Sequence, residues 1–175
     1  MEIWDGYYED GSLAGVDLIR GEALPQGLYH MVCEALVRHA DGDYLLMQRD
    51  FAKETHPGEW EATAGGSALK GEDGPTCIRR ELWEETGICA ESFTQVGYEI
   101  YRERGTIFYC YLCMVDCDKT AVRLQAGETV AYKWMSEREF IEFVNSGEMI
   151  GSQRRRYQGF LERAGYLHKP PESGN

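Results

Sequence analysis

The sequence lacks the features of membrane and secreted proteins. No stretch approaches the ~20 apolar residues that span a bilayer, and the start, Met1 to Asp5, has no basic segment followed by an apolar one. Basic residues are also scarce, with 18 Lys and Arg against 30 Asp and Glu and a formal net charge of −12. Such a charge repels a nucleic-acid backbone. We therefore expect a cytoplasmic protein that binds neither a membrane nor a nucleic-acid polymer.

The six cysteines are expected to be reduced, because no secretion signal is present. Cys110 and Cys113 form a CxxC pair, but Tyr111 and Leu112 between them favour a strand. Residues three apart on a strand point to opposite faces, so a shared zinc ion is not expected. Small buried apolar side chains are the better interpretation of this pair.

Turn residues divide the chain into an N-terminal extension or hairpin (1–27), a main domain (28–168) and a flexible tail (169–175). Periodicity predicts strands at 28–38, 44–48, 59–64, 93–102, 106–116 and 129–135, and helices at 76–86, 136–146 and 151–164. A glycine-rich loop is expected from Gly65 to Gly74. The simplest architecture is an α/β fold, a mixed sheet with helices on its faces. The basic run 154–156 is expected on a solvated helix face, with an anion contact as the alternative.

Three carboxylates fall on one side of the predicted helix 76–86. Glu81, Glu84 and Glu85 lie within an arc of roughly 100°, with Ile78 and Leu82 beside it. Like charges at these spacings destabilise a helix by about 0.2–0.5 kcal/mol per pair, and the helix dipole prefers cations in the last turn. A hard divalent cation, which prefers oxygen ligands, would reverse this repulsion. A solvated acidic face is the alternative.

The same segment resembles the Nudix box, G-x5-E-x7-R-E-U-x-E-E-x-G-U, in which U is a bulky aliphatic residue. The matching positions are Gly66, Glu72, Arg80, Glu81, Leu82, Glu84, Glu85, Gly87 and Ile88. The approach His56 to Glu61 and Trp134, which follows a loop containing Glu128, also look like this family. The likeness spans roughly 28–145 and implies a Nudix-type α/β/α sandwich. Gly21 to Pro25 is similar to the leader of a subgroup close to isopentenyl-diphosphate isomerases.

The resemblance assigns roles to residues of the box. Glu81, Glu84 and Glu85 would be catalytic and would hold Mg²⁺, with Mn²⁺ as a substitute, and Glu81 could also act on the attacking water. Arg80 would orient these carboxylates through charge-assisted hydrogen bonds. Glu72 would bind the metal through water or brace the loop, and Gly65 would offer a backbone carbonyl. The metal would activate water and neutralise the charge of a diphosphate.

Two residues outside the box are candidates for substrate binding. Glu128 lies where many members of the family place a further ligand or base, although a solvated loop carboxylate is as reasonable. Arg49, at the end of a predicted strand, could face a substrate phosphate or form a surface salt bridge. The expected activity is Mg-dependent hydrolysis of the diphosphate linkage in a nucleoside-diphosphate-like or other small organic diphosphate. The sequence leaves the substrate and a homodimeric assembly open.

Two other functions fit this sequence less well than hydrolysis does. Isopentenyl-diphosphate isomerases share the fold but resemble one another in a catalytic Cys and a ligand His near the glycine loop, and Thr63 to Ser67 contains neither. His30 could match an isomerase metal ligand, but a single His on a strand is more often structural. A non-catalytic, ligand-sensing Nudix module often loses box carboxylates, whereas this chain keeps them all. Hydrolysis is therefore the favoured prediction.

Overall fold

The structure is a computed structural model that describes residues 1–168, so the expected tail at 169–175 lies outside it. Within the described part, the main sheet has seven strands. These are β3 (His30–His39), β4 (Tyr44–Arg49), β5 (Trp60–Glu61), β6 (Thr63–Ser67), β7 (Phe93–Tyr101), β8 (Thr106–Val115) and β9 (Thr129–Met135). β3 pairs with β8 in parallel and with β4 and β6 antiparallel. The predicted mixed sheet is therefore confirmed.

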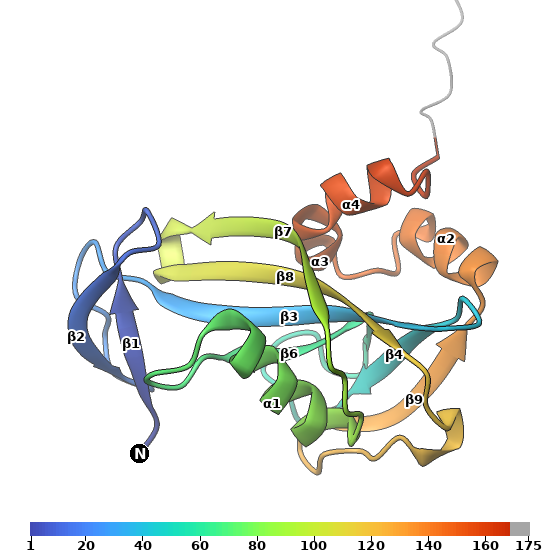
Figure 1. Ribbon diagram of the computed structural model, residues 1–175, viewed down its shortest axis with the longest axis horizontal. Helices are drawn as coiled ribbons and strands as arrows, with labels where there is room; N and C mark the ends of the chain where they lie inside the picture. The colour runs from blue at the N-terminus through green and yellow to red at the C-terminus, as the bar shows by residue number, and fades with distance from the viewer. Residues whose placement is uncertain (169–175) are drawn as a thin grey trace, which may run out of the picture.

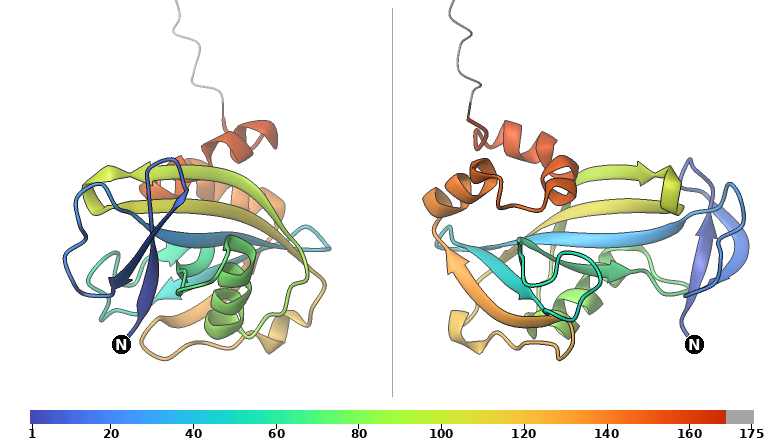
Figure 2. Two further views of the ribbon diagram at one scale, coloured as in Figure 1. Left: turned by 60° about the vertical axis from the view of Figure 1, so that its left-hand side comes forward. Right: turned by 180° about the vertical axis from the view of Figure 1, so that it is seen from behind.

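Helices cover both faces of this sheet (Figures 1 and 2). α1 (Gly74–Thr86) packs on one face, where Ile78 and Leu82 are buried against β3 and β8. α2 (Glu137–Ser146), α3 (Gly151–Arg156) and α4 (Gln158–Arg163) pack on the other, around Phe140 and Leu161. The predicted α/β/α sandwich is thus confirmed. None of the helices in residues 1–168 is long and apolar enough to cross a membrane.

The two cysteines of the CxxC pair lie in different cores. Cys113 belongs to the core on the α1 face, and Cys110 to the core on the face of α2 to α4. Both are completely buried as free cysteines. The alternation expected for a strand is confirmed, and it separates the two sulfur atoms.

The N-terminal residues form a separate hairpin at one end of the molecule (Figure 1). β1 (Ile3–Tyr7) pairs antiparallel with β2 (Leu13–Ile19). The hairpin joins the main sheet through two backbone hydrogen bonds between Tyr7 and Tyr29, at 2.8 and 2.9 Å. At its open end, the Arg20 backbone N–H donates to the Glu2 carbonyl at 3.1 Å. Both ends of the hairpin are therefore fixed by backbone contacts.

α1 has the ends that its flanking residues predict. Asp73 is the N-cap and accepts a hydrogen bond from the Thr76 N–H at 2.8 Å, with Pro75 in the first turn. At the other end, Gly87 adopts a left-handed conformation (φ 70°) and its N–H donates to the Trp83 carbonyl at 2.9 Å. The helix begins at Gly74, slightly before the predicted start.

The region expected to be a glycine-rich loop is partly strand. Gly65 and Gly66 belong to β6, where they pair with Glu34 and Cys33 of β3. A Cβ atom at Gly65 would lie 2.2 Å from the Cys33 carbonyl oxygen and 2.6 Å from the Glu34 Cα. Glycine is needed here because the backbones of β6 and β3 approach closely. A glycine pair in a sequence can indicate either such an approach or a flexible loop, and the sequence alone does not distinguish the two.

The helix expected at 151–164 is also interrupted, at Tyr157. This residue ends α3 and begins α4, and its side chain is fully buried. Its hydroxyl lies 3.0 Å from the Glu34 carbonyl oxygen and 3.2 Å from that of Tyr111. These contacts with the sheet fix Tyr157 at the junction of the two helices. Two short 3₁₀ helices, Arg102–Arg104 and Lys119–Ala121, complete the chain's elements in the described residues.

The close approach at Gly65 predicts a large effect of a single methyl group. Gly65→Ala should lower the free energy of unfolding by about 1–3 kcal/mol or more, because both obstructing atoms belong to the β3 backbone. Gly151→Ala is the matched control, since a Cβ atom there meets nothing within 4 Å. Urea unfolding of both variants measures the difference. Equal stability of the two would contradict this account of Gly65.

Candidate active site

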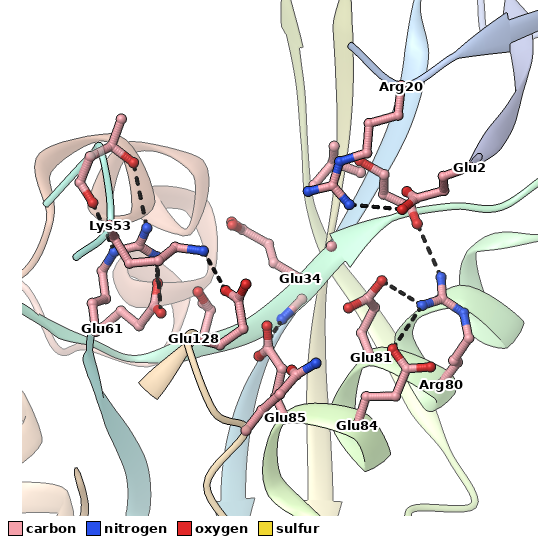
Figure 3. A pocket seen from close by; sticks show the side chains of 18 of the residues that line it. Glu2, Arg20, Glu34, Lys53, Glu61, Arg80, Glu81, Glu84, Glu85 and Glu128 are labelled. Carbon is pink, nitrogen blue, oxygen red and sulfur yellow. Dashed lines mark hydrogen bonds and ion pairs between the residues drawn. The ribbon is translucent and has the colours of Figure 1, made fainter. Parts of the chain in front are cut away.

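A pocket of about 970 Å³ lies where the two halves of the sandwich and the N-terminal hairpin meet (Figure 3). Its volume is in the range of small-molecule sites, about 300–1,000 Å³. Charged side chains dominate its walls. Seven of them are glutamates: Glu2, Glu34, Glu61, Glu81, Glu84, Glu85 and Glu128. The pocket therefore gathers acidic residues from the hairpin, the sheet, α1 and the loop before β9.

The three predicted carboxylates of α1 all line this pocket. Glu85 accepts a hydrogen bond from the Gly65 N–H at 3.1 Å. A Cβ atom at Gly66 would lie 2.5 Å from the Glu81 carboxyl carbon. The two glycines of β6 therefore leave room for the α1 carboxylates to reach the pocket. The sequence instead predicts a contact between the metal and the Gly65 backbone carbonyl, and this contact stays a prediction.

Arg80 connects the predicted site residues to one another. Its Nε and Nη2 atoms donate to Glu72 at 2.8 and 2.9 Å. Its Nη1 donates to Glu81 at 2.7 Å and to Glu84 at 3.2 Å. The bond from Arg80 holds the pKa of Glu72 below its ordinary value. Glu72 also accepts from the Leu69 N–H at 2.9 Å, so it braces the turn before α1.

Glu85 is the carboxylate without a cationic partner. Within residues 1–168 it forms no ion pair, in contrast to Glu81 and Glu84. Burial raises the pKa of Glu85 well above its ordinary value, and the carboxylates of Glu61 and Glu81 raise it further. Burial is also the main reason why the pKa of Glu81 is raised, although Arg80 opposes it. A cation in the pocket would compensate this excess of negative charge.

The chemistry of these side chains suits magnesium, although they are not gathered around one point. No group of three or more His, Cys, Asp or Glu side chains in the described chain is arranged as a metal cluster. Arg80 holds Glu81 and Glu84 on one side, while Glu85 faces Gly65. All the donors are oxygen atoms, the ligands that Mg²⁺ prefers. The uncompensated Glu85 is the observation that favours a cation here.

The two predicted substrate-binding residues also line the pocket, and both are already paired. Arg49 donates from Nη1 to both oxygens of Glu61, at 3.0 and 3.1 Å. The two side chains are only 16% and 14% exposed, so this pair is not at the open surface. Glu128 accepts from Lys53 Nζ at 2.5 Å. Each candidate thus meets the pocket as one half of an ion pair.

A buried ion pair that the sequence did not predict forms another wall. Glu34 of β3 accepts from Arg156 Nε and Nη2 at 2.6 and 2.7 Å, and the side chains are 7% and 8% exposed. The guanidinium lies 4.2 Å from the centre of the Phe108 ring. The expectation of a solvated face at 154–156 is therefore wrong for Arg156. The available signal is the charged residue Glu34, which stands among the apolar residues of 31–37.

Further pocket residues also escaped prediction. Gln153 of α3 donates to Glu61 at 3.2 Å and to the Thr63 hydroxyl at 2.8 Å. From the hairpin, Arg20 donates to Glu2 at 2.7 Å. These residues have no sequence motif, and only the tertiary structure brings them together.

Known proteins match most of this chain. A family model described as NUDIX domain matches residues 28–155. An uncharacterized Nudix hydrolase of Listeria monocytogenes is 33% identical over 151 residues, covering 86% of this chain and 89% of that protein. An isopentenyl-diphosphate Delta-isomerase of Rhodobacter capsulatus is 36% identical over 81 residues, or 46% of each chain. A crystal structure from Deinococcus radiodurans has a TM-score of 0.69 at 16% identity, covering 90% of this chain and 98% of that one, and supports the fold alone.

The buried ion pair predicts a stability difference between adjacent arginines. Arg156→Met should lower the free energy of unfolding by about 3–5 kcal/mol, because it leaves the buried Glu34 charge without a partner. Arg155→Met removes the more exposed pair with Glu99 and should cost about 1 kcal/mol or less. Urea unfolding compares the two variants. The burial argument fails if both variants lose the same stability.

The raised pKa of Glu85 predicts a pH dependence in the presence of chelator. The folded chain binds this proton more tightly than the unfolded chain, so the free energy of unfolding rises as pH falls through the raised pKa. In Glu85→Gln this contribution is absent. The difference in free energy of unfolding between the variant and the parent should therefore be largest near pH 8. It should decrease as the pH falls toward the ordinary pKa of a glutamate. Thermal melts across pH test this, and a constant advantage would refute it.

Proposed function

We propose that this chain, which belongs to the Nudix family, hydrolyses the diphosphate linkage of a small organic molecule with the help of Mg²⁺. One observation carries the proposal. The chain keeps every defined residue of the Nudix box, and the box carboxylates Glu81, Glu84 and Glu85 open into one pocket of about 970 Å³. A nucleoside-diphosphate-like molecule or another small organic diphosphate is the proposed substrate.

The proposed metal ligands are the three carboxylates of α1. Glu81, Glu84 and Glu85 would hold Mg²⁺, or Mn²⁺ in its place, with the Gly65 carbonyl and Glu72 through water as further contacts. When bound, the metal supplies activation of water and neutralises charge on the diphosphate. Arg80 orients Glu81 and Glu84, since it donates to both. We assign Glu81 the additional role of accepting a proton from the attacking water.

Arg49 and Glu128 are proposed to contact the substrate. Both line the pocket, and each has a partner that can remain in place when a ligand enters, Glu61 for Arg49 and Lys53 for Glu128. Such pairs hold the side chains in defined positions before the substrate arrives, which lowers the entropy lost on binding.

Isomerase chemistry of the isopentenyl-diphosphate type is less well supported. The match to the Rhodobacter capsulatus isomerase covers 46% of this chain. His30, which could match an isomerase ligand, stacks on Trp4 at 4.5 Å and contacts the Gly105 carbonyl at 3.1 Å, outside the pocket. Among residues 1–168, no cysteine lines the pocket. A purely sensing role is disfavoured because the acidic stripe is complete.

The proposal predicts that magnesium stabilises the folded chain through the acidic stripe. At free metal about 100 times the dissociation constant, binding to the native state alone adds about 2.7 kcal/mol. Glu84→Gln and Glu85→Gln should lose most of the resulting rise in melting temperature and most diphosphate hydrolysis. In chelator, Glu85→Gln should be at least as stable as the parent, because it removes like-charge repulsion. Glu84→Gln should stay close to the parent, because the exposed pair with Arg80 that it also removes contributes about 1 kcal/mol or less.

The control for this prediction is Glu142→Gln, an exposed glutamate on α2 away from the pocket. It should keep the full magnesium effect and full activity. Calorimetric melts with magnesium and with chelator, together with chromatographic detection of the monophosphate products from a panel of diphosphates, provide the two measurements. Equal magnesium-induced shifts in the parent, Glu84→Gln and Glu85→Gln would sink the assignment of the metal ligands.

A further inference from the structure

The N-terminal hairpin places one arginine at the pocket, and we propose that this residue, Arg20, binds a phosphate oxygen of the substrate. The inference rests on the proposed function, because it names a contact in the same site. It also adds a residue from outside the stretch 28–155 that matches the family. Arg20 would be a substrate-binding residue, with no part in activating water.

Most cations of the pocket are occupied by buried or half-buried partners. Arg49, Lys53, Arg80 and Arg156 have side chains between 8% and 26% exposed, and each is paired with at least one glutamate. Arg80 alone makes contacts with three carboxylates. Moving any of these cations toward a ligand would leave a carboxylate without its partner in a poorly solvated place, which is costly. These cations can therefore meet a substrate only from their present positions, as proposed for Arg49 beside Glu61, and none is free to turn toward a phosphate.

Arg20 differs from these cations in exposure and in free donors. Its side chain is 65% exposed, and its one ion pair is Nη1 with Glu2 at 2.7 Å. Its Nε and Nη2 atoms form no hydrogen bond within residues 1–168. Figure 3 shows its guanidinium extending from the hairpin toward the carboxylates of Glu34 and Glu81. A guanidinium with an unused edge can bind two phosphate oxygens at once.

The ion pair between Arg20 and Glu2 is not needed to close the hairpin. The backbone hydrogen bond from Arg20 to Glu2 already does so at 3.1 Å, and Trp4 and Leu18 are buried beneath. Glu2 is itself fixed by a bond from the Trp4 indole at 2.8 Å. Glu2 is therefore a partner of Arg20 that neither the fold of the hairpin nor the proposed phosphate contact requires.

The composition of the pocket makes recognition of phosphate the natural role for such a residue. Among the described residues, no Phe, Tyr or Trp lines the pocket, and His56 is the one aromatic ring there. Its glutamates repel an anionic ligand unless cations compensate them. The guanidinium of Arg20 at the mouth attracts an anionic ligand without breaking the ion pairs inside the pocket. The phosphates are thus the part of the substrate that these walls recognise best.

The test measures binding of methylenediphosphonate, a diphosphate analogue that is not hydrolysed, by titration calorimetry in magnesium. Arg20→Gln should weaken binding at least about tenfold, which corresponds to about 1.4 kcal/mol. Glu2→Gln should bind within about threefold of the parent, because the arginine remains. Lys70→Gln removes a charge from the same rim, where Lys70 is 52% exposed and paired with Asp17, and should also stay within about threefold. Thermal melts check that all variants fold.

The inference is wrong if Arg20→Gln binds the analogue as tightly as the parent. It is also wrong if Glu2→Gln loses as much affinity as Arg20→Gln, since the effect would then come from the hairpin. An equal loss in Lys70→Gln would likewise overturn it, because only the total charge of the pocket would then matter. A parent that binds no methylenediphosphonate would also overturn it. Failure of the proposed function is distinct. In that case the parent binds the analogue through Arg20 but forms no monophosphate products from any diphosphate tested.

Discussion

Repulsion between carboxylates is the constraint on which the organisation of this molecule depends. Seven glutamates line one pocket, and the fold brings a cation to most of them. Arg80 forms ion pairs with Glu81 and Glu84 within α1, while Arg156 pairs with Glu34 from the opposite face of the sheet. The Arg156 pair joins α3 to β3, whereas Arg80 reduces the repulsion between carboxylates within α1. The carboxylate left over, Glu85, lies where the proposed metal ion completes the compensation.

The parts of the structure that sequence predicts are those that depend on near neighbours. The ends of α1 follow from Pro75 and Gly87, whose backbone preferences act within one turn. The 3.6-residue period places Ile78 and Leu82 in the core and turns the neighbouring carboxylates toward the pocket. The alternation of a strand separates the CxxC cysteines in the same way. Local geometry alone therefore accounts for the box helix and for its acidic stripe.

The parts that escaped prediction depend on residues far apart in the chain. Glu34 and Arg156 are separated by 122 positions, so no local pattern reveals that each buries the charge of the other. Tyr157 interrupts the last helix because its hydroxyl reaches carbonyls of two strands. Gly65 lies in β6, where the neighbouring β3 backbone leaves no room for a side chain. In each case contacts between distant parts of the chain decide the structure, and the local sequence does not contain them.

The pocket draws on more of the chain than the family match covers. Its walls begin at Met1, include Arg20 and end at Arg156, whereas the family match runs from residue 28 to residue 155. A fragment cut at the family boundaries would keep the whole Nudix box and lose the hairpin together with the partner of the buried Glu34. The recognisable signature is thus shorter than the site it serves. Grafting, fusion or trimming of this protein should treat both flanks as part of the binding surface.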